Sequence, residues 1–460
     1  MDKLKMQTEN IADKNFEVLS KMFPNALTET ITGYDDDGKP IVERAIDADV
    51  LRQEISCKVV EGKDERYQFT WPDKKKAIME ANMPINKSLR PCIEESVDFS
   101  NTENLYIEGD NLEILKLLQE TYLEKIKMIY IDPPYNTGND FIYNDNYEED
   151  TDEYIGRSGQ LDEYGNRLVK NIETNGRFHT DWLNMIYPRI KLARNLLRED
   201  GVIMISMDDG EYENLKRICN EIFGEKNFIE CLIWKKRATP PNDKNIGRIH
   251  EFILCYAKDI EKVSLGLLPR DAKSIERYAN PDNDPRGPWV ASDLSANGKG
   301  GRIVRSCVYP IRNPSDGKDY YPSEGRCWLF NKEKMNIWIK EGRVRETTGA
   351  PFLKRYLSEV RQGLTLPTIM TEFGYSMTSA AEADKLFKKK GIFEYAKPTT
   401  LINPLLRIGA PNKKCIVLDF FSGSATTAHA LMQLNAENEG RRKYIMVQIP
   451  EKTDEKSEAY

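Results

Sequence analysis

The sequence has few of the patterns that would place it in a membrane or around a metal ion. No apolar run approaches the roughly 18 residues that a membrane span needs, and the first residues lack the apolar core of a signal peptide. Histidine occurs only three times in 460 residues, and the eight cysteines include no C-x-x-C pair. This usage argues against a zinc site and against a disulfide framework. We therefore expect a cytoplasmic protein without a bound metal.

Charge is distributed unevenly along the chain. The formal net charge is −7, which by itself argues against nucleic acid as a partner. Between residues 235 and 363, however, 25 Lys and Arg stand against 16 Asp and Glu, so this stretch carries +9 and the remainder −16. Basic side chains can neutralise phosphates, and their distribution matters more than the sum. The middle of the chain is therefore a candidate for contact with DNA.

A tetrapeptide after a short apolar run is the most informative feature. Residues 128–131 predict a buried strand, and the two prolines of Asp132-Pro133-Pro134-Tyr135 end it because they lack N–H donors. Ligands bind at the carboxyl ends of strands in an open parallel sheet. A carboxylate, two carbonyl oxygens and an aromatic ring are thus expected at an active-site edge. Taken alone, the tetrapeptide is equally compatible with a strand followed by an ordinary turn.

These groups suit methyl transfer to the exocyclic amine of a nucleobase. The lone pair of such an amine is delocalised into the ring, which makes the nitrogen a poor nucleophile. The Asp132 carboxylate and the Pro133 carbonyl oxygen can accept the amine hydrogens and draw the nitrogen toward tetrahedral geometry. Tyr135 can stack on a base that has left the duplex. We expect direct in-line transfer without a covalent intermediate, and the same geometry would serve adenine N6 or cytosine N4.

A second strand and turn near the end of the chain predict a nucleotide-type ligand. The apolar run 416–418 leads to Asp419 and the turn Phe421-Ser422-Gly423, and a helix is expected to start near residue 426. Glycine lets the backbone approach a ligand, and a helix start offers free N–H groups. The phosphate-loop pattern G-x-x-x-x-G-K-[ST] and the full G-x-G-x-x-G are both absent. On its own, this turn is weak evidence for a binding site.

The pattern along the chain divides it into four segments. Alternating strands and helices are predicted for residues 101–234 and again for 397–460. The alternation breaks down between 235 and 396, where arginines and aromatic residues interleave. Residues 1–100 contain no catalytic grouping and are expected to form an accessory module.

Four stretches in this order resemble the N6-adenine DNA methyltransferases whose catalytic motif precedes their cofactor motif. The resemblance is most detailed to the modification subunit of type III restriction-modification systems. It implies a circularly permuted, doubly wound, Rossmann-like α/β sheet, with an inserted α+β target-recognition domain at 235–396. The matching stretches are residues 104–135, 200–209, 397–403 and 419–430.

The resemblance also implies S-adenosylmethionine as the methyl donor and a role for each matching residue. The chain departs from the family pattern at two places. Ala425 stands where the turn F-x-G-x-G has its last glycine, for which we expect a modest effect, and the acid that accepts from the ribose hydroxyls is replaced. The implied catalytic residues are Asp132, Pro133, Pro134 and Tyr135, and the implied cofactor-binding residues are Asp110, Lys397, Pro398, Thr399, Asp419, Phe421, Ser422 and Gly423, with Gln448 or Glu451 at the ribose.

Double-stranded DNA, a second copy of the chain and a separate restriction subunit with helicase and nuclease activity are the implied partners. Two alternatives remain open: an N4-cytosine DNA methyltransferase, and a DNA-binding specificity subunit with little activity of its own. An RNA or protein methyltransferase is less favoured, because the basic insert and the resemblance both indicate DNA. Modification subunits usually extend well beyond the second cofactor strand, so we expect a chain truncated at its C-terminus.

Overall fold

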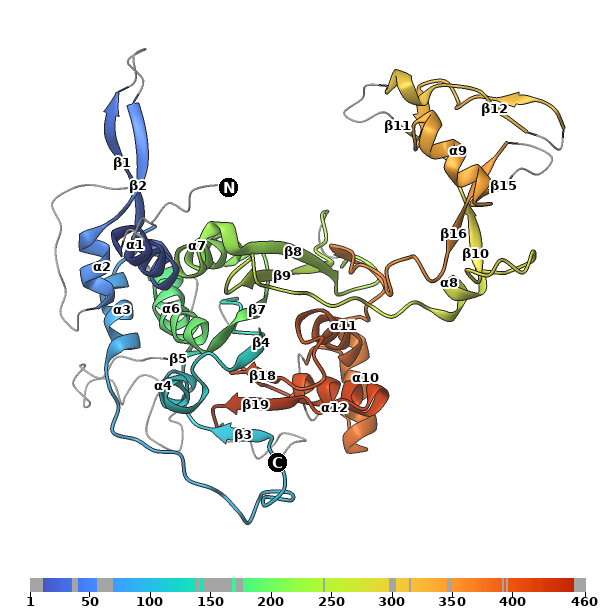
Figure 1. Ribbon diagram of the computed structural model, residues 1–460. Coiled ribbons are helices and arrows are strands. Elements are labelled where there is room, and N and C mark those ends of the chain that lie inside the picture. Colours follow the sequence, from blue (N-terminus) through green and yellow to red (C-terminus); the bar gives the residue numbers. More distant parts are fainter. Residues whose placement is uncertain are drawn as a thin grey trace. The chain divides into compact units, whose positions relative to one another are not determined.

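The computed structural model divides into two compact units (Figure 1). The first comprises Met1–Gly266 and Leu366–Tyr460, and the second is the inserted stretch Leu267–Thr365. Each unit is described by itself. The structure describes residues 11–34, 40–55, 69–137, 141–143, 168–170, 177–242, 245–297, 303–313, 316–345, 350–390, 393 and 396–450.

A mixed sheet of eight described strands is the centre of the first unit. In spatial order the strands are β17 (Ile369–Met370), β8 (Phe228–Lys235), β9 (His250–Ala257), β7 (Leu197–Met207), β4 (Ile126–Ile131), β18 (Ile416–Asp419), β19 (Lys443–Gln448) and β3 (Leu105–Glu108). The five strands from β7 to β3 are parallel. β9 is antiparallel to both β7 and β8, and β17 is parallel to β8.

The strand order reverses between β4 and β18. From β4 the chain passes through α6 (Phe178–Leu196) to β7 on one side, whereas from β18 it passes through α12 (Thr426–Asn438) to β19 on the other. A reversal of this kind leaves a crevice at the carboxyl ends of the two central strands, where ligands bind in open α/β sheets. Asp132 follows β4 and Asp419 ends β18, so both predicted sites lie at this crevice.

Helices cover both faces of the sheet. All six residues of β4 are buried, and its side chains alternate between the two faces. Ile129 and Ile131 share a core with α4 (Asn111–Tyr122), α6 and α7 (Tyr212–Phe223). Met128 points the other way, toward Gly409 of α11 (Thr399–Gly409). The doubly wound α/β fold is therefore confirmed. Within the described residues, no helix is both long and apolar enough to cross a bilayer.

The N-terminal elements belong to the same compact unit as the sheet. They comprise α1 (Ile11–Met22), η1 (Pro24–Ala26), the antiparallel pair β1 (Leu27–Tyr34) and β2 (Pro40–Ile46), α2 (Ala48–Glu54) and α3 (Lys74–Asn82). The Trp71 indole N–H donates to Asn184 of α6 at 2.7 Å, and Lys74 pairs with Glu221 of α7 at 2.6 Å. The described part of residues 1–100 is thus joined to α6 and α7 by polar contacts and by shared core packing.

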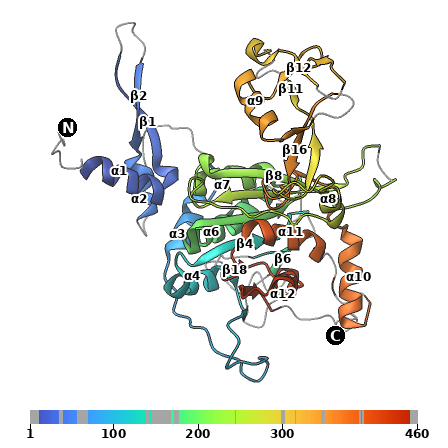
Figure 2. The same ribbon diagram turned by 45° about the vertical axis from the view of Figure 1, so that its right-hand side comes forward.

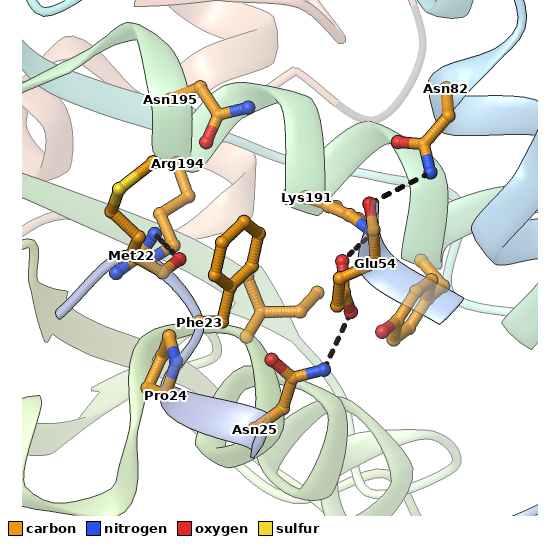
Figure 3. Close-up of a pocket in the computed structure, with 11 residues that line it drawn as sticks. Met22, Phe23, Pro24, Asn25, Glu54, Asn82, Lys191, Arg194 and Asn195 are labelled. Atoms are coloured by element: carbon orange, nitrogen blue, oxygen red, sulfur yellow. Dashed lines mark hydrogen bonds and ion pairs between the residues drawn. The ribbon is translucent and has the colours of Figure 1, made fainter. Parts of the chain in front are cut away.

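A cavity of about 220 Å³ lies between these N-terminal elements and α6 (Figure 3). The Glu54 carboxylate lines it, accepts from Asn25 at 2.6 Å and pairs with Lys191. Arg194 donates to the Met22 carbonyl oxygen at 3.2 Å. None of the residues predicted for catalysis or cofactor binding lines this cavity, so it is separate from the crevice of the sheet.

The inserted unit has short elements around its own small core. In Figure 2, α9 (Lys332–Lys340) lies beside the short strands β11 (Ser295–Asn297) and β12 (Ile311–Arg312). Its other elements are α8 (Ala272–Glu276), β10 (Trp289–Ser292), η4 (Arg305–Cys307), β13 (Asp319–Tyr320), β14 (Arg326–Trp328), β15 (Val344–Arg345) and β16 (Phe352–Tyr356). The core residues are Leu294, Tyr309, Ile311, Trp328, Met335 and Val344.

This unit is narrower than the interval 235–396 expected from the sequence. Strand β9 pairs with β7 and β8 through six or more residues and so belongs to the central sheet. Strand β17 and α10 (Ser376–Phe387) also fall in the first unit. The break in βα alternation arises because β9 is antiparallel, which the sequence pattern does not distinguish from the start of a new domain. The role of the insert in target recognition stays a prediction.

Candidate active site

The turn after β4 is fixed by hydrogen bonds from two helices. The buried indole of Trp182 donates to the Pro134 carbonyl oxygen at 2.8 Å. Asn136 adopts a left-handed backbone (φ 60°) and donates to the fully buried Glu211 carboxylate at 2.6 Å. One of the two carbonyls expected to be exposed is therefore already bonded. The Pro133 carbonyl has no hydrogen-bond donor among the residues described, and Pro133 itself is buried.

The Asp132 carboxylate faces a lysine. The Nζ of Lys397 lies 2.7 Å from Oδ1 and 2.6 Å from Oδ2, and the Tyr135 hydroxyl donates to Oδ1 at 2.8 Å. Lys397 precedes α11 and is 265 residues from Asp132 in the sequence. The sequence assigned Lys397 to the cofactor, whereas the structure brings it directly onto the predicted catalytic carboxylate.

Tyr135 is held by the same group of charges. Its hydroxyl also lies 3.2 Å from Oε2 of Glu251, and the Lys397 ammonium is 5.0 Å from the centre of its ring. Burial raises the pKa of Tyr135 well above its usual value, and the neighbouring carboxylates Asp132 and Glu251 raise it further. The phenol therefore remains protonated and acts as a donor. Its predicted stacking on a flipped base stays a prediction.

Glu251 and Lys236 complete this site, and the sequence did not indicate either one. Glu251, on β9, is only 7% exposed, and its Oε1 accepts from Lys236 at 2.8 Å. Burial raises the pKa of Glu251, but Lys397 and Lys236 outweigh burial, so the pKa is lowered overall. Burial lowers the pKa of Lys397, and Asp132 and Glu251 outweigh it, so that pKa is raised. The negative charges of the two carboxylates and the positive charges of the two ammonium groups thus cancel. The only available signal was a lone acid beginning the apolar run 252–257.

The turn after β18 is organised around Asp419. This carboxylate is 2% exposed, accepts from the Phe421 backbone N–H at 3.1 Å and accepts from the Thr427 hydroxyl at 2.6 Å. The Gly423 N–H donates to the Gln448 side-chain oxygen at 2.7 Å. The buried Ser422 hydroxyl has no hydrogen-bond partner among the residues described. A buried hydroxyl of this kind favours a polar ligand in the turn.

Stability should depend on pH through Asp419. Burial raises its pKa from 3.8 to about 7, and the Asp132 charge adds to the increase. Because the folded-state pKa exceeds the unfolded one, this carboxyl stabilises the fold fully below about pH 4, and the contribution is lost as the pH rises toward about 7. We expect the free energy of unfolding to decrease more between about pH 5 and pH 7 in the wild type than in Asp419→Asn. Urea denaturation at both pH values measures this difference, and equal decreases would contradict it.

Ala425 occupies a conformation that favours glycine. Its φ of 56° and ψ of 29° are left-handed, and it is the residue before α12. A residue with a Cβ is roughly 1–2 kcal/mol less stable in the left-handed region than in the right-handed one. Glycine avoids this cost but loses more conformational entropy on folding. Alanine in place of the last glycine of F-x-G-x-G therefore costs conformational free energy at this turn. The sequence led us to expect a modest effect but did not show its cause.

Replacing Ala425 with glycine should stabilise the protein. We expect Ala425→Gly to increase the free energy of unfolding by about 1 kcal/mol, since it relieves the left-handed alanine and suits the position before a helix. The matched control is Ala428→Gly inside α12, which should decrease it by about 1 kcal/mol. Urea denaturation measures both, and destabilisation by the first change would show that Ala425 is not strained.

The remaining predicted cofactor residues that the structure describes have structural partners or begin a helix. Asp110 caps α4, accepting from the Leu112 N–H at 2.8 Å, and lies 3.2 Å from the fully buried Arg189. Asn111 donates to the Phe420 carbonyl at 2.8 Å, which ties the start of α4 to the cofactor turn. Pro398 precedes α11, the Thr399 N–H donates to Glu382 at 2.9 Å, and Glu451 lies outside the described residues.

The chain is similar to known proteins over most of its length. A family model described as DNA methylase, of the N6/N4 type, matches residues 126–457. The chain is 32% identical to the type III restriction-modification enzyme EcoPI Mod subunit of Escherichia phage P1, over 99% of this chain and 72% of that protein. It is 32% identical to the EcoP15I Mod subunit of Escherichia coli, over 98% and 73%. It is 30% identical to the type II methyltransferase M.KpnI of Klebsiella pneumoniae, over 80% and 84%.

Proposed function

This chain belongs to the N6/N4 DNA methylase family, and from that membership we propose that it methylates adenine N6 in DNA as the modification subunit of a type III restriction-modification system. The methyl donor in this proposal is S-adenosylmethionine.

One observation supports the reaction most directly. The Asp132 carboxylate and the Asp419 turn follow two neighbouring parallel strands, with Val417 beside Met128 and Leu418 beside Ile129. A base at the first site and a methyl donor at the second would therefore meet at the crevice of the sheet. Holding two reactants in this way supplies much of the acceleration when the chemistry needs no covalent intermediate.

The chain's own groups would prepare the amine. The Pro133 carbonyl oxygen and the Asp132 carboxylate are acceptors for the two hydrogens of an exocyclic amine. When both hydrogens are bonded, the nitrogen lone pair is less delocalised and can point toward the incoming methyl group. Trp182 and Glu211, through Pro134 and Asn136, keep the turn in place for this role.

The residues of the second turn fit the proposed cofactor. The unpartnered Ser422 hydroxyl, the small Gly423 and the start of α12, which has no side-chain cap, offer polar groups and space for a ligand. Asp419, Phe421 and Gly423 would hold its amino-acid part, with Gln448 near the ribose and Asp110 near the adenine. When bound, S-adenosylmethionine supplies an electrophilic methyl group.

The inserted unit is the proposed reader of the DNA sequence. Residues 267–365 contain 18 Lys and Arg against 12 Asp and Glu. Some of these cations form ion pairs within the unit: Arg286 pairs with Asp284 at 2.8 Å, and Lys354 pairs with Asp282 at 2.6 Å. Arg305 and Arg312 are exposed on short elements and are available to phosphates or base edges. Several aromatic residues of the unit are unavailable for such contacts, since Trp289, Tyr309 and Trp328 are buried.

We also propose partners on the basis of the relatives. Two of them are named as Mod subunits of type III restriction-modification enzymes, which supports pairing with a separate restriction subunit. The similarity to a type II methyltransferase supports methyl transfer that does not require the restriction subunit.

Nucleoside mass spectrometry tests the reaction. Mixed-sequence duplex DNA is incubated with the protein and S-adenosylmethionine, digested and analysed for methylated bases. We expect N6-methyladenine. If N4-methylcytosine forms instead, the proposed fold and cofactor stand, and the substrate is cytosine N4. If no methylated base forms while the protein still retards the same duplex in a gel, a DNA-binding specificity subunit would be the better description.

A further inference from the structure

The Lys397 ammonium bridges the two oxygens of the Asp132 carboxylate in this structure. Nζ lies within 2.7 Å of both oxygens, so it competes with a base amine for the same acceptor. Lys397 is itself only 11% exposed at its side chain and therefore cannot simply turn out into solvent. For the proposed reaction, Lys397 has to leave Asp132 and find another anion close by.

Glu251 is placed to be that anion. Its Oε2 is 3.6 Å from the Lys397 Nζ, about 1 Å longer than the bonds to Asp132, so a small displacement would convert the contact into a hydrogen bond. The same Oε2 is 3.2 Å from the Tyr135 hydroxyl, and Oε1 is fixed by Lys236 at 2.8 Å. Lys236 thus fixes the orientation of the Glu251 carboxylate, and Oε2 can accept a hydrogen bond from Lys397.

We propose that Lys397 exchanges between two carboxylates during the reaction, releasing Asp132 to the base amine as it moves to Glu251. Glu251 is a positioning residue in this exchange and does not contact the substrate. The inference rests on the proposed function and adds a step to it: access of the amine to Asp132. Buried ammonium groups need a paired anion, and the total charge of the four groups stays zero when Lys397 changes partner.

The exchange also explains why a buried acid is present on β9. A carboxylate at this place costs free energy unless it is paired, and Lys236 pairs with its Oε1 at 2.8 Å. Its Oε2 lies 3.2 Å from the Tyr135 hydroxyl and 3.6 Å from Lys397, so it can also receive the ammonium when Asp132 is released.

Replacing Glu251 with glutamine should trap Lys397 on Asp132. We expect Glu251→Gln to lower the single-turnover rate of methyl transfer by about a hundredfold, because the neutral amide is a poor destination for the ammonium. The affinity for S-adenosylmethionine, measured by calorimetry, should change less than about twofold, since Glu251 has no contact with the cofactor turn. The matched control is Glu230→Gln, an exposed glutamate on the neighbouring strand β8, which should transfer at the wild-type rate.

A second variant separates the exchange from a structural role. In Glu251→Gln combined with Lys397→Gln, no ammonium blocks Asp132, and the transfer rate should recover at least about tenfold over Glu251→Gln alone. A double variant as slow as the single one, or a wild-type rate in Glu251→Gln, would overturn the proposal. Both results remain distinct from failure of the proposed function, in which the wild type and Glu230→Gln would form no methylated base on mixed-sequence DNA.

Discussion

Replacing Asp132 with alanine should nearly abolish methyl transfer, with a decrease in kcat of at least about a hundredfold. The carboxylate is the charged acceptor that the amine needs, and the Pro133 carbonyl alone cannot engage both hydrogens. The fold should survive, because Lys397 retains Glu251 at 3.6 Å as a paired anion. Binding of S-adenosylmethionine and of DNA should stay close to wild type. Transfer of the labelled methyl group from S-adenosylmethionine to mixed-sequence DNA measures the rate, and calorimetry measures the affinity.

Asp209→Ala is the matched control for this change. Asp209 follows the adjacent strand β7, is exposed and pairs with Arg248 at 2.5 Å, so it is a carboxylate at the same edge of the sheet without a place in the reaction. We expect its kcat to stay within about twofold of wild type. Wild-type turnover in Asp132→Ala would show that the reaction takes place elsewhere.

Replacing Gly423 with aspartate should weaken S-adenosylmethionine binding by at least about a hundredfold. The amino-acid part of this cofactor carries a carboxylate, and a second carboxylate introduced into the turn would repel it at short range. The change adds some backbone strain, since Gly423 has a φ of +50°, but aspartate adopts this region more readily than most residues, and an added Cβ would meet the Phe393 ring at an ordinary 3.6 Å. Calorimetric titration with S-adenosylmethionine measures the loss.

The neutral isostere separates charge from bulk. Gly423→Asn has the same shape as the aspartate variant and the same tolerance of a left-handed backbone, so we expect it to weaken binding by only about tenfold. Equal losses in both variants would assign the effect to bulk alone. Unchanged affinity in the aspartate variant would place the cofactor outside this turn.

Much of the fold followed from local patterns. The apolar runs before Asp132 and Asp419 are each short and end at residues that cannot or need not continue a strand, so the position of both carboxylates at strand ends was predictable. Parallel strands in one sheet place such ends at a common edge, and the structure has both turns there, after the paired strands β4 and β18. The structure confirms both strands and the helix after each.

Most partners of the Asp132 carboxylate and its turn were not predictable from the sequence. Glu251 reaches the site only because β9 is antiparallel, and its strand lay in the interval assigned to the insert. Lys397 reaches Asp132, and Trp182 reaches Pro134, from distant parts of the sequence. Neither hydrophobic periodicity nor turn chemistry predicts side-chain contacts of that kind. The left-handed backbone of Ala425 likewise could not be predicted from the sequence, since alanine disfavours that conformation.

The order of the strands has a consequence for synthesis of the protein on the ribosome. β18 and β19 enter the sheet between β4 and β3, although both of those strands leave the ribosome some 300 residues earlier. Until then the apolar edge of β4 lacks its neighbour, and the two carboxylates Asp132 and Asp419 cannot face each other. A nascent chain should therefore be unable to modify DNA before translation has passed β19, and it should need chaperones while that edge is exposed.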